Sequence, residues 1–361
     1  VLELGKSLRR TGWTVVHVPR GAEAAAVLAA ADTRRVLLVV DDAASRPGLS
    51  AMLDAIGRVY TNLGLYVEAE SLLTTALDRR RAVLGADHVD LSESLNSLGE
   101  LMSDLGDHPA AESLFQQSLA LRRRVLGAEH PQVAVGMNNL ALAYYHRGDY
   151  TAAEPLFRDA LALERRVLGN AHHEVAVTLN NLGSLLREKG DLDAAEAMLR
   201  EALAIWQRAL GPEHAQVALC MNNLGTILRR KGDYEAAEGF FREALDIRRK
   251  TLGPDHPHVA TSLSNLAVVL SDQDDDEGAE ALYREVLALR RRLHPAPHPR
   301  LAVSLYNLSV TVLDRGAFDE AERLMLDAIG QWRAVLGEEH PEVASGLRGL
   351  GLIYLRKGDL A

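Results

Sequence analysis

The sequence predicts an all-α protein in which helical hairpins stack into an α-solenoid, preceded by a small α/β fragment. Three observations carry this prediction. A histidine recurs every 42 residues through most of the 361-residue chain. Apolar residues between these histidines have the spacing of amphipathic helices, and glycines interrupt the helical pattern at regular places. In the first 49 residues, stretches with a helical pattern alternate with β-rich stretches, and the 42-residue repeat is absent.

Several columns of residues follow the period of 42. The periodic histidines are His88, His130, His172, His214, His256, His298 and His340. A column of leucines runs from Leu98 to Leu350, and a small residue follows each leucine: Gly99, Ala141, Gly183, Gly225, Ala267, Ser309 and Gly351. An alanine followed by glutamate recurs from Ala69 to Ala321. Self-similarity at a fixed period of this size indicates a repeat architecture.

Each unit contains two helices, as the unit around residue 140 shows. Its first apolar stripe has the i, i+3, i+4, i+7 spacing of a helix and consists of Met137, Leu140, Ala141 and Tyr144. We expect this helix A over 133–147. Gly148-Asp149 ends it, and a second stripe predicts helix B, which stops near Gly169. Because one hairpin cannot bury its apolar faces alone, neighbouring units must stack.

Two domains are expected, a partial α/β fragment over 1–49 and a solenoid over 50–361. The solenoid would hold seven hairpins and an unpaired last helix A over 343–357, because the chain stops where the next helix B should begin. Two units depart from the pattern. Asp274 and its neighbours replace the usual Gly-Asp, and the Leu-Gly stop is missing from 292–297.

The pattern resembles the tetratricopeptide repeat. The small-residue column, the Gly-Asp turn, the alanine of helix B and its aromatic residue match that family; the aromatic residues are Phe115, Phe157, Phe241 and Tyr283. Units longer than the common 34 residues, such as LGAEHPQVAVGMNNLALAYYHRGDYTAAEPLFRDAL (126–161), look like the kinesin light chain type of repeat. The resemblance implies a right-handed superhelix whose A helices line a concave groove.

The first 49 residues read as a βαβ piece of a parallel sheet. A helical stretch precedes a β-rich run over 13–18, an alanine-rich helix is expected near 21–31, and a strand over 36–40 ends in Asp41-Asp42. This resembles part of the core of STAND-type NTPases. The resemblance implies that Asp41 would hold magnesium through water and that Asp42 would help to activate the attacking water.

A phosphate-binding loop is needed for nucleotide hydrolysis. Gly5-Lys6-Ser7 has part of the required pattern, but only a few residues separate it from the strand near Trp13, which is too short for the helix that should follow. We therefore expect that this chain is not an enzyme on its own and binds no cofactor.

Composition excludes other classes. The net charge of −10 argues against nucleic-acid binding, because phosphate contacts need a surplus of lysine and arginine. Cys220 is the single cysteine, so no intrachain disulfide and no cysteine-based zinc site is expected. The lack of a long apolar run or a signal-peptide pattern indicates a cytoplasmic protein that does not bind membranes. The periodic histidines lie in turns one unit apart, so we expect local backbone contacts and no metal site.

Two columns of asparagine run along helix A. The column Asn139, Asn181, Asn223, Asn265 and Asn307 is expected to bond neighbouring helices. The resemblance places a second stripe in the groove, where amides could bind the backbone of an extended peptide: Asn96, Asn138, Asn180 and Asn222, with Tyr145 and His146. Arg187, Arg229 and Arg230 on this stripe would favour an acidic segment, unless they pair with acids such as Glu188. Repeat one would present Glu93, Glu100 and Asp104.

Arginine runs end several B helices, at 79–81, 122–124 and 290–292. We interpret them as cations that interact favourably with the negative C-terminal end of the helix dipole. The predicted function is a protein–protein interaction scaffold that binds peptides or partner proteins in its groove. The alternative is the sensor arm of a STAND-type ATP-dependent switch whose phosphate-binding loop lies outside this chain. The sequence leaves the oligomeric state open.

Overall fold

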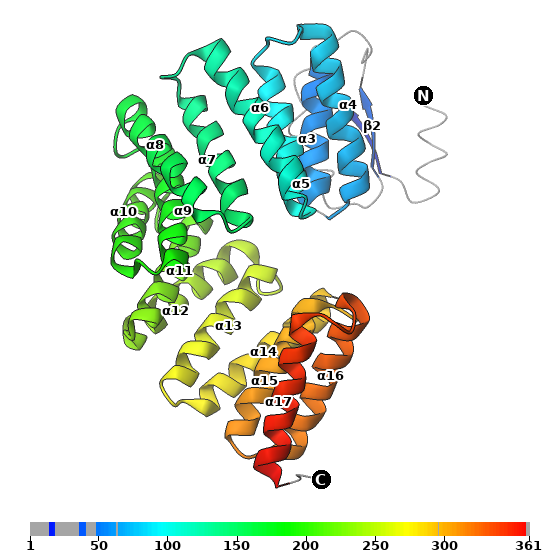
Figure 1. Cartoon of the computed structure of the whole chain (residues 1–361), viewed down its shortest axis with the longest axis vertical. Helices are drawn as coiled ribbons and strands as arrows, with labels where there is room; N and C mark the ends of the chain where they lie inside the picture. Colours follow the sequence, from blue (N-terminus) through cyan, green and yellow to red (C-terminus); the bar gives the residue numbers. More distant parts are fainter. Residues whose placement is uncertain (1–13, 19–35, 41–47, 63, 295, 359–361) are drawn as a thin grey trace. The chain divides into compact units, whose positions relative to one another are not determined.

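The computed structural model describes residues 14–18, 36–40, 48–62, 64–294 and 296–358. These residues form two strands and fifteen helices, coloured in chain order in Figure 1. The helices are α3 (Gly48–Asn62), α4 (Tyr66–Leu84), α5 (Asp90–Asp104), α6 (His108–Leu126), α7 (Pro131–His146), α8 (Tyr150–Leu168), α9 (His173–Lys189), α10 (Leu192–Leu210), α11 (Ala215–Lys231), α12 (Tyr234–Leu252), α13 (Pro257–Asp272), α14 (Asp276–Leu293), α15 (Pro299–Asp314), α16 (Phe318–Leu336) and α17 (Pro341–Lys357).

The odd-numbered helices are the predicted A helices and the even-numbered ones are the B helices. The chain divides into two compact units, with three hairpins (α3 to α8) in residues 1–170 and four (α9 to α16), followed by α17, in 171–361. Each B helix packs against the A helices that precede and follow it within the same unit. None of the described helices is long and apolar enough to cross a membrane.

The two strands lie where the sequence predicts them. Strand β1 (Thr14–Val18) pairs in parallel with β2 (Val36–Val40), with Thr14 opposite Val36. The helices expected before and between the strands, the Gly5-Lys6-Ser7 segment, and Asp41 and Asp42 lie outside the described residues. The α/β fragment as a whole therefore stays a prediction.

In five of the seven described hairpins, the turn from helix A to helix B has a residue with positive φ followed by a capping aspartate. Gly148 has φ of 83°, and the Asp149 side chain accepts a hydrogen bond from the Ala152 backbone N–H at 3.0 Å. In repeat five Asp274 takes the glycine position with φ of 61°. Aspartate tolerates this left-handed conformation better than most residues, so the turn survives the change noted in the sequence.

Each periodic histidine caps the N-terminus of an A helix. His130 Nδ1, for example, accepts a hydrogen bond from the Gln132 backbone N–H at 3.2 Å. The other six histidines make the same bond, with the backbone N–H two residues later. A neutral ring with its proton on Nε2 fulfils this role. The expected local backbone role of these histidines is confirmed.

The small-residue column allows the two helices of a hairpin to approach closely. A Cβ added at Gly99 would lie 2.8 Å from Phe115 Cε1, and one added at Gly225 would lie 2.8 Å from Phe241 Cε1. These distances are shorter than van der Waals contact, so the aromatic ring of helix B fills the space that a side chain would need.

A buried arginine links several B helices to the next A helix. Arg248 Nη1 donates hydrogen bonds to the His258 backbone oxygen at 3.2 Å and to Ser262 Oγ at 2.6 Å. The equivalent arginines donate to the first turn of the following A helix in the same way: Arg80, Arg122 and Arg290. This adds a second role to the arginine runs, because one arginine of each run holds the next hairpin, while others such as Arg123 and Arg124 lie in the last turn of the helix as expected.

Candidate functional site on the A helices

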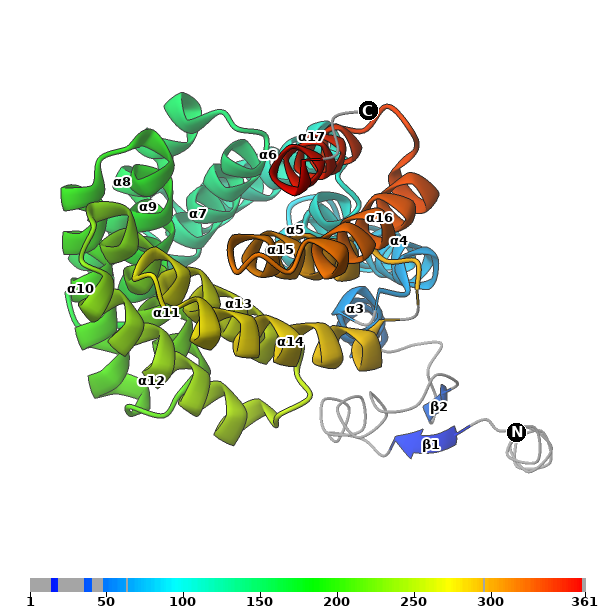
Figure 2. The same cartoon turned by 90° about the horizontal axis from the view of Figure 1, so that it is seen from below.

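Several consecutive A helices contact each other: α3, α5 and α7 in residues 1–170, and α9, α11 and α13 as well as α15 and α17 in 171–361. In the second unit, Figure 2 shows α9, α11 and α13 along the inner edge and α10, α12 and α14 along the outer edge. We use "A-helix face" for the surface that is formed in α11 by Leu219, Asn222, Thr226, Arg229 and Arg230, and in the other A helices by the residues at multiples of 42 positions away.

The two asparagine columns form one hydrogen-bonded ladder between successive A helices. Asn223 Nδ2 donates to Asn180 Oδ1 at 2.9 Å, and Asn265 Nδ2 donates to Asn222 Oδ1 at 2.9 Å. In the first unit, Asn139 Nδ2 donates to Asn96 Oδ1 at 2.5 Å. The expected helix-to-helix role is thus confirmed for Asn139, Asn223 and Asn265.

The asparagines assigned to the groove are less accessible than the sequence suggests. Asn138 and Asn180 are each 6% exposed and Asn222 is 8% exposed, while Asn96 is half-buried. The carbonyl oxygens of Asn96, Asn180 and Asn222 already accept a ladder bond. Any partner would therefore meet mainly the amide N–H groups of this column.

The ladder begins with a carboxylate that sequence reasoning missed. Asp54 occupies the position 42 residues before Asn96, is 2% exposed, and accepts a hydrogen bond from Ser97 Oγ at 3.2 Å. Arg58 and Arg80 lie 3.7 and 3.9 Å from its carboxyl oxygens. Extending the asparagine column back by one period would have identified Asp54 from the sequence.

The first unit has an acidic stretch on its A-helix face. Asn96 Nδ2 donates to Glu100 Oε1 at 2.7 Å. Burial raises the pKa of the Glu100 carboxyl. The neighbouring Asp104 and Asp54 raise this pKa further, whereas Asn96 and Arg58 lower it. Burial also raises the pKa of Asp104, against the attraction of His146. The third expected acid, Glu93, forms an ion pair with Arg80 at 3.7 Å.

Tyr145 and His146 lie at the end of α7, in the same unit as these acids. Their rings meet edge to face with centroids 5.4 Å apart, and the Tyr145 ring also lies 5.6 Å from that of Tyr150. Burial lowers the pKa of His146, and His108 lowers it further, whereas Asp104 opposes the shift. The structure thus brings His146 close to an acid, and the predicted arginines belong to the other unit.

The three predicted arginines are largely engaged within the second unit. Arg187 pairs with the adjacent Glu188, its Nε lying 3.0 Å from Oε1. Arg229 Nη1 lies 2.8 Å from Asp272 Oδ2 on the next A helix. Arg230 Nη1 donates to the Arg187 backbone oxygen at 2.9 Å and has no acidic partner among the described residues. Arg187 and Arg229 are therefore paired with acids of the protein, which is the alternative to binding an acidic segment.

Apolar side chains separate the amides from the ion pairs on this face. Leu219 and Val310 are each 37% exposed, and Val177, Val268 and Val303 are half-buried at equivalent positions of this face. The A-helix face of residues 171–361 thus combines apolar contacts, amide N–H groups and paired charges. Extended peptides offer complementary groups to such a surface.

The solved structures with a similar fold include the following three. BtubC (BKLC) from P. vanneervenii is 26% identical, with a TM-score of 0.56 over 64% of this chain and 92% of that one. A putative kinesin light chain with nearly identical TPR-like repeats from Podosopora anserina is 23% identical, with a TM-score of 0.50 over 57% and 97%. The quorum sensor NprR from B. thuringiensis is 14% identical, with a TM-score of 0.54 over 85% and 88%. No curated protein matches the sequence.

The repeats also match a protein family directly. The matched segments are 49–124, 98–166, 132–205, 174–250, 225–292, 260–329 and 300–361, and the family is described as tetratricopeptide repeat. The match begins at residue 49, so the predicted nucleotide-binding fragment takes no part in it. The array of helical hairpins, its periodic caps and this match lead to one conclusion: the chain belongs to the tetratricopeptide repeat family.

Proposed function

We propose that this protein is an interaction scaffold that binds an extended segment of a partner protein along the A-helix face of residues 171–361. The observation that carries the proposal is the asparagine ladder. Each bond of the ladder fixes two side-chain amides between neighbouring A helices, one buried and one half-buried in residues 171–361, so their remaining polar groups are already oriented before a partner arrives.

The ladder bond between Asn222 and Asn265 shows which polar groups of the two amides remain available to a partner. Asn222 Oδ1 accepts from Asn265 Nδ2, whereas Asn222 Nδ2 and Asn265 Oδ1 make no hydrogen bond with the described residues and are not sealed from solvent. The NH2 group of Asn222 and the carbonyl oxygen of Asn265 therefore remain available as donor and acceptor. A peptide backbone presents the matching acceptor and donor at every residue, so it can bind such amides without a particular sequence.

Selectivity would come from the side chains beside the ladder. Leu219 and Val310 offer apolar contact, and the ion pair between Arg229 and Asp272 reduces the net charge of the face. We therefore propose a segment with apolar side chains at intervals. A preference for acidic segments would rest on Arg230, whose guanidinium has no acidic partner among the described residues.

Selection of displayed peptides against the full chain, followed by fluorescence anisotropy on the enriched peptides, tests the proposal. We expect Leu219→Glu to weaken binding by about tenfold, roughly 1.4 kcal/mol, because it places a charge among the apolar contacts. The matched control is Leu326→Glu on the B helix α16, where the side chain is 47% exposed. Equal affinity of the wild type and both variants would exclude the A-helix face as the site.

The alternative function is that of a sensor arm in a STAND-type switch. The parallel pairing of β1 and β2 supports it, because the expected nucleotide-binding fragment needs these two strands. Calorimetry with ATP and magnesium, on the wild type and on a variant carrying Asp41→Ala and Asp42→Ala, tests it. Binding that the variant loses would favour the switch, and the absence of heat in both proteins would remove it.

A further inference from the structure

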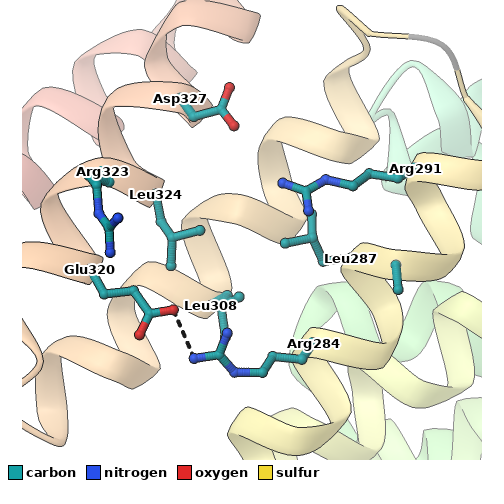
Figure 3. A pocket seen from close by; sticks show the side chains of 9 residues that line it. Arg284, Leu287, Arg291, Leu308, Glu320, Arg323, Leu324 and Asp327 are labelled. Carbon is teal, nitrogen blue, oxygen red and sulfur yellow. Dashed lines mark hydrogen bonds and ion pairs between the residues drawn. The ribbon is translucent and has the colours of Figure 1, made fainter.

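Two cavities of residues 171–361 differ in their charge. Figure 3 shows a hollow of about 440 Å³ between the B helices α14 and α16. Acids and bases both line it: Arg284 donates to Glu320 at 2.8 Å, and Asp327 lies on the same helix as Glu320. Two acids therefore offset most of the positive charge of the three arginines that line this hollow, Arg284, Arg291 and Arg323.

The second cavity, of about 350 Å³, lies between the first turns of α13 and α15 and the last turn of α14. Its charged or titratable lining consists of His258, Arg290, His294 and Arg300, with no acidic residue among the lining residues. Apolar side chains such as Leu293 and Val303 form the rest of the wall. We refer to this cavity as the cationic pocket.

The cations of this pocket stand where other repeats carry acids or amides. His258 and Arg300 each occupy the second position after the histidine that caps helix A. The residues at this position in the other repeats are Asp90, Gln132, Glu174, Gln216 and Glu342. The Arg300 guanidinium carries a positive charge in the first turn of α15, next to the positive end of the helix dipole, and this placement is locally unfavourable for the folded protein.

A third substitution adds a histidine to the same cavity. His294 occupies a position that is leucine in the other repeats: Leu84, Leu126, Leu168, Leu210, Leu252 and Leu336. Its ring stacks on the capping His298, with centroids 3.9 Å apart and an interplanar angle of 10°. Arg290 is held beside them by hydrogen bonds to the Arg300 backbone oxygen and to Ser304 Oγ.

The positive charge is not compensated by nearby acids. Burial is the largest cause that lowers the pKa of His258, His294 and His298. The neighbouring charges that lower these pKa values further are all cationic or titratable to cations: Arg248, Arg290, Arg300, His256 and His298. The Arg300 guanidinium makes no hydrogen bond or ion pair with the described residues, so its donors remain available to a ligand.

We infer that the cationic pocket binds the phosphoryl group of a small phosphorylated molecule. The guanidinium of Arg300 offers paired N–H donors that suit phosphate oxygens, and the nearby N-termini of α13 and α15 favour an anion. The volume of about 350 Å³ falls within the range of small-molecule sites, and Leu293 and Val303 provide contact for an apolar remainder of the ligand. This site is separate from the A-helix face and uses none of the residues proposed to bind peptide.

Calorimetry on the full chain, with inorganic phosphate and phenyl phosphate as probes at constant ionic strength, tests the inference. We expect both probes to bind and phenyl phosphate to bind more tightly, because its ring reaches the apolar wall. Arg300→Glu restores the acid that Glu174 and Glu342 provide elsewhere, so the fold should tolerate it. This variant should bind phosphate at least tenfold more weakly, and His294→Leu should weaken binding as well.

The matched control is Arg291→Glu, because Arg291 is an exposed arginine that lines the hollow between α14 and α16 and not the cationic pocket. It should bind phosphate as the wild type does. Three results would overturn the inference: no binding of either probe to the wild type, undiminished binding to the Arg300→Glu variant, or equally tight binding of acetate, which would remove the preference for phosphate.

Discussion

Asn265 donates a hydrogen bond to Asn222, 43 residues earlier, across two consecutive A helices. The bond from Asn223 to Asn180 and the bond from Asn139 to Asn96 have the same separation. Because the repeat length is 42, one column donates to the neighbouring column of the preceding repeat. The ladder therefore resists sliding of one hairpin along the next while it orients the amides that a partner would meet.

Removal of one ladder bond should reduce stability measurably. Asn265→Ala leaves Asn222 Oδ1 without its donor, and Asn222 is only 8% exposed. We expect the free energy of unfolding to fall by about 1 kcal/mol in urea denaturation. The exposed Asn170→Ala should change it by less than about 0.5 kcal/mol. Simple additivity of Asn222→Ala and Asn265→Ala in a double-mutant cycle would contradict the interaction.

The buried arginine of α12 should contribute more to the free energy of unfolding than its exposed neighbour. Arg248 is 4% exposed and bonds Ser262 and the backbone of α13, whereas the adjacent Arg249 pairs with Glu285 at the surface. Arg248→Ala removes charged hydrogen bonds in the interior, and we expect a loss of about 2 kcal/mol. Arg249→Ala should cost about 0.5 kcal/mol or less. Equal losses in urea denaturation would show that the inward arginine has no special role.

Features within one repeat could be predicted from the sequence. The histidine caps, the Gly-Asp turns and the hairpin packing at Gly99 and Gly225 depend on residues close in sequence. Each feature also recurs in several repeats, so the sequence provides several examples of the same pattern. The bounds of α7 accordingly differ by at most two residues from the expected 133–147.

Contacts between repeats were harder to predict. The ladder from Asn265 to Asn222 depends on how far one A helix is displaced along the next, and one repeat alone does not contain this information. The run of arginines at 290–292 likewise does not reveal which side chain points inward. The pairing of Arg229 with Asp272 follows from the same displacement, so the net charge of the A-helix face could not be judged from Arg229 alone.

The small-residue column provides a test with an internal control. Gly225→Val places a side chain against Phe241, whose Cε1 would lie 2.8 Å from the new Cβ. We expect the free energy of unfolding to fall by about 1–3 kcal/mol from overpacking. Gly351 belongs to the same column, but no neighbouring atom lies within 4 Å of its added Cβ. Gly351→Val should therefore change stability by no more than about 0.5 kcal/mol in the same urea denaturation.

The histidines around the cationic pocket should make stability depend on pH. Burial lowers the pKa of the His298 imidazole, and the nearby Arg300 and Arg290 lower it further. Above the ordinary histidine pKa of 6.5, the ring is neutral in both the folded and the unfolded chain, so stability is greatest there. As the pH falls below this value, the unfolded chain takes up protons first, so the free energy of unfolding decreases until the folded pKa is reached. Protonation would also remove the acceptor with which His298 Nδ1 caps α15.

Urea denaturation at pH 7.5 and at pH 5.5 measures this loss, and phosphate-free buffers keep the pocket empty. His294→Leu removes one of the histidines whose folded pKa is lowered by burial and by neighbouring cations, so its stability should fall less over the same interval. The same variant also removes the repulsion between the protonated forms of His294 and His298, because leucine cannot carry a charge. An equal decrease in the wild type and in the variant would show that these histidines do not control the acid sensitivity, which would then arise from other titrating groups.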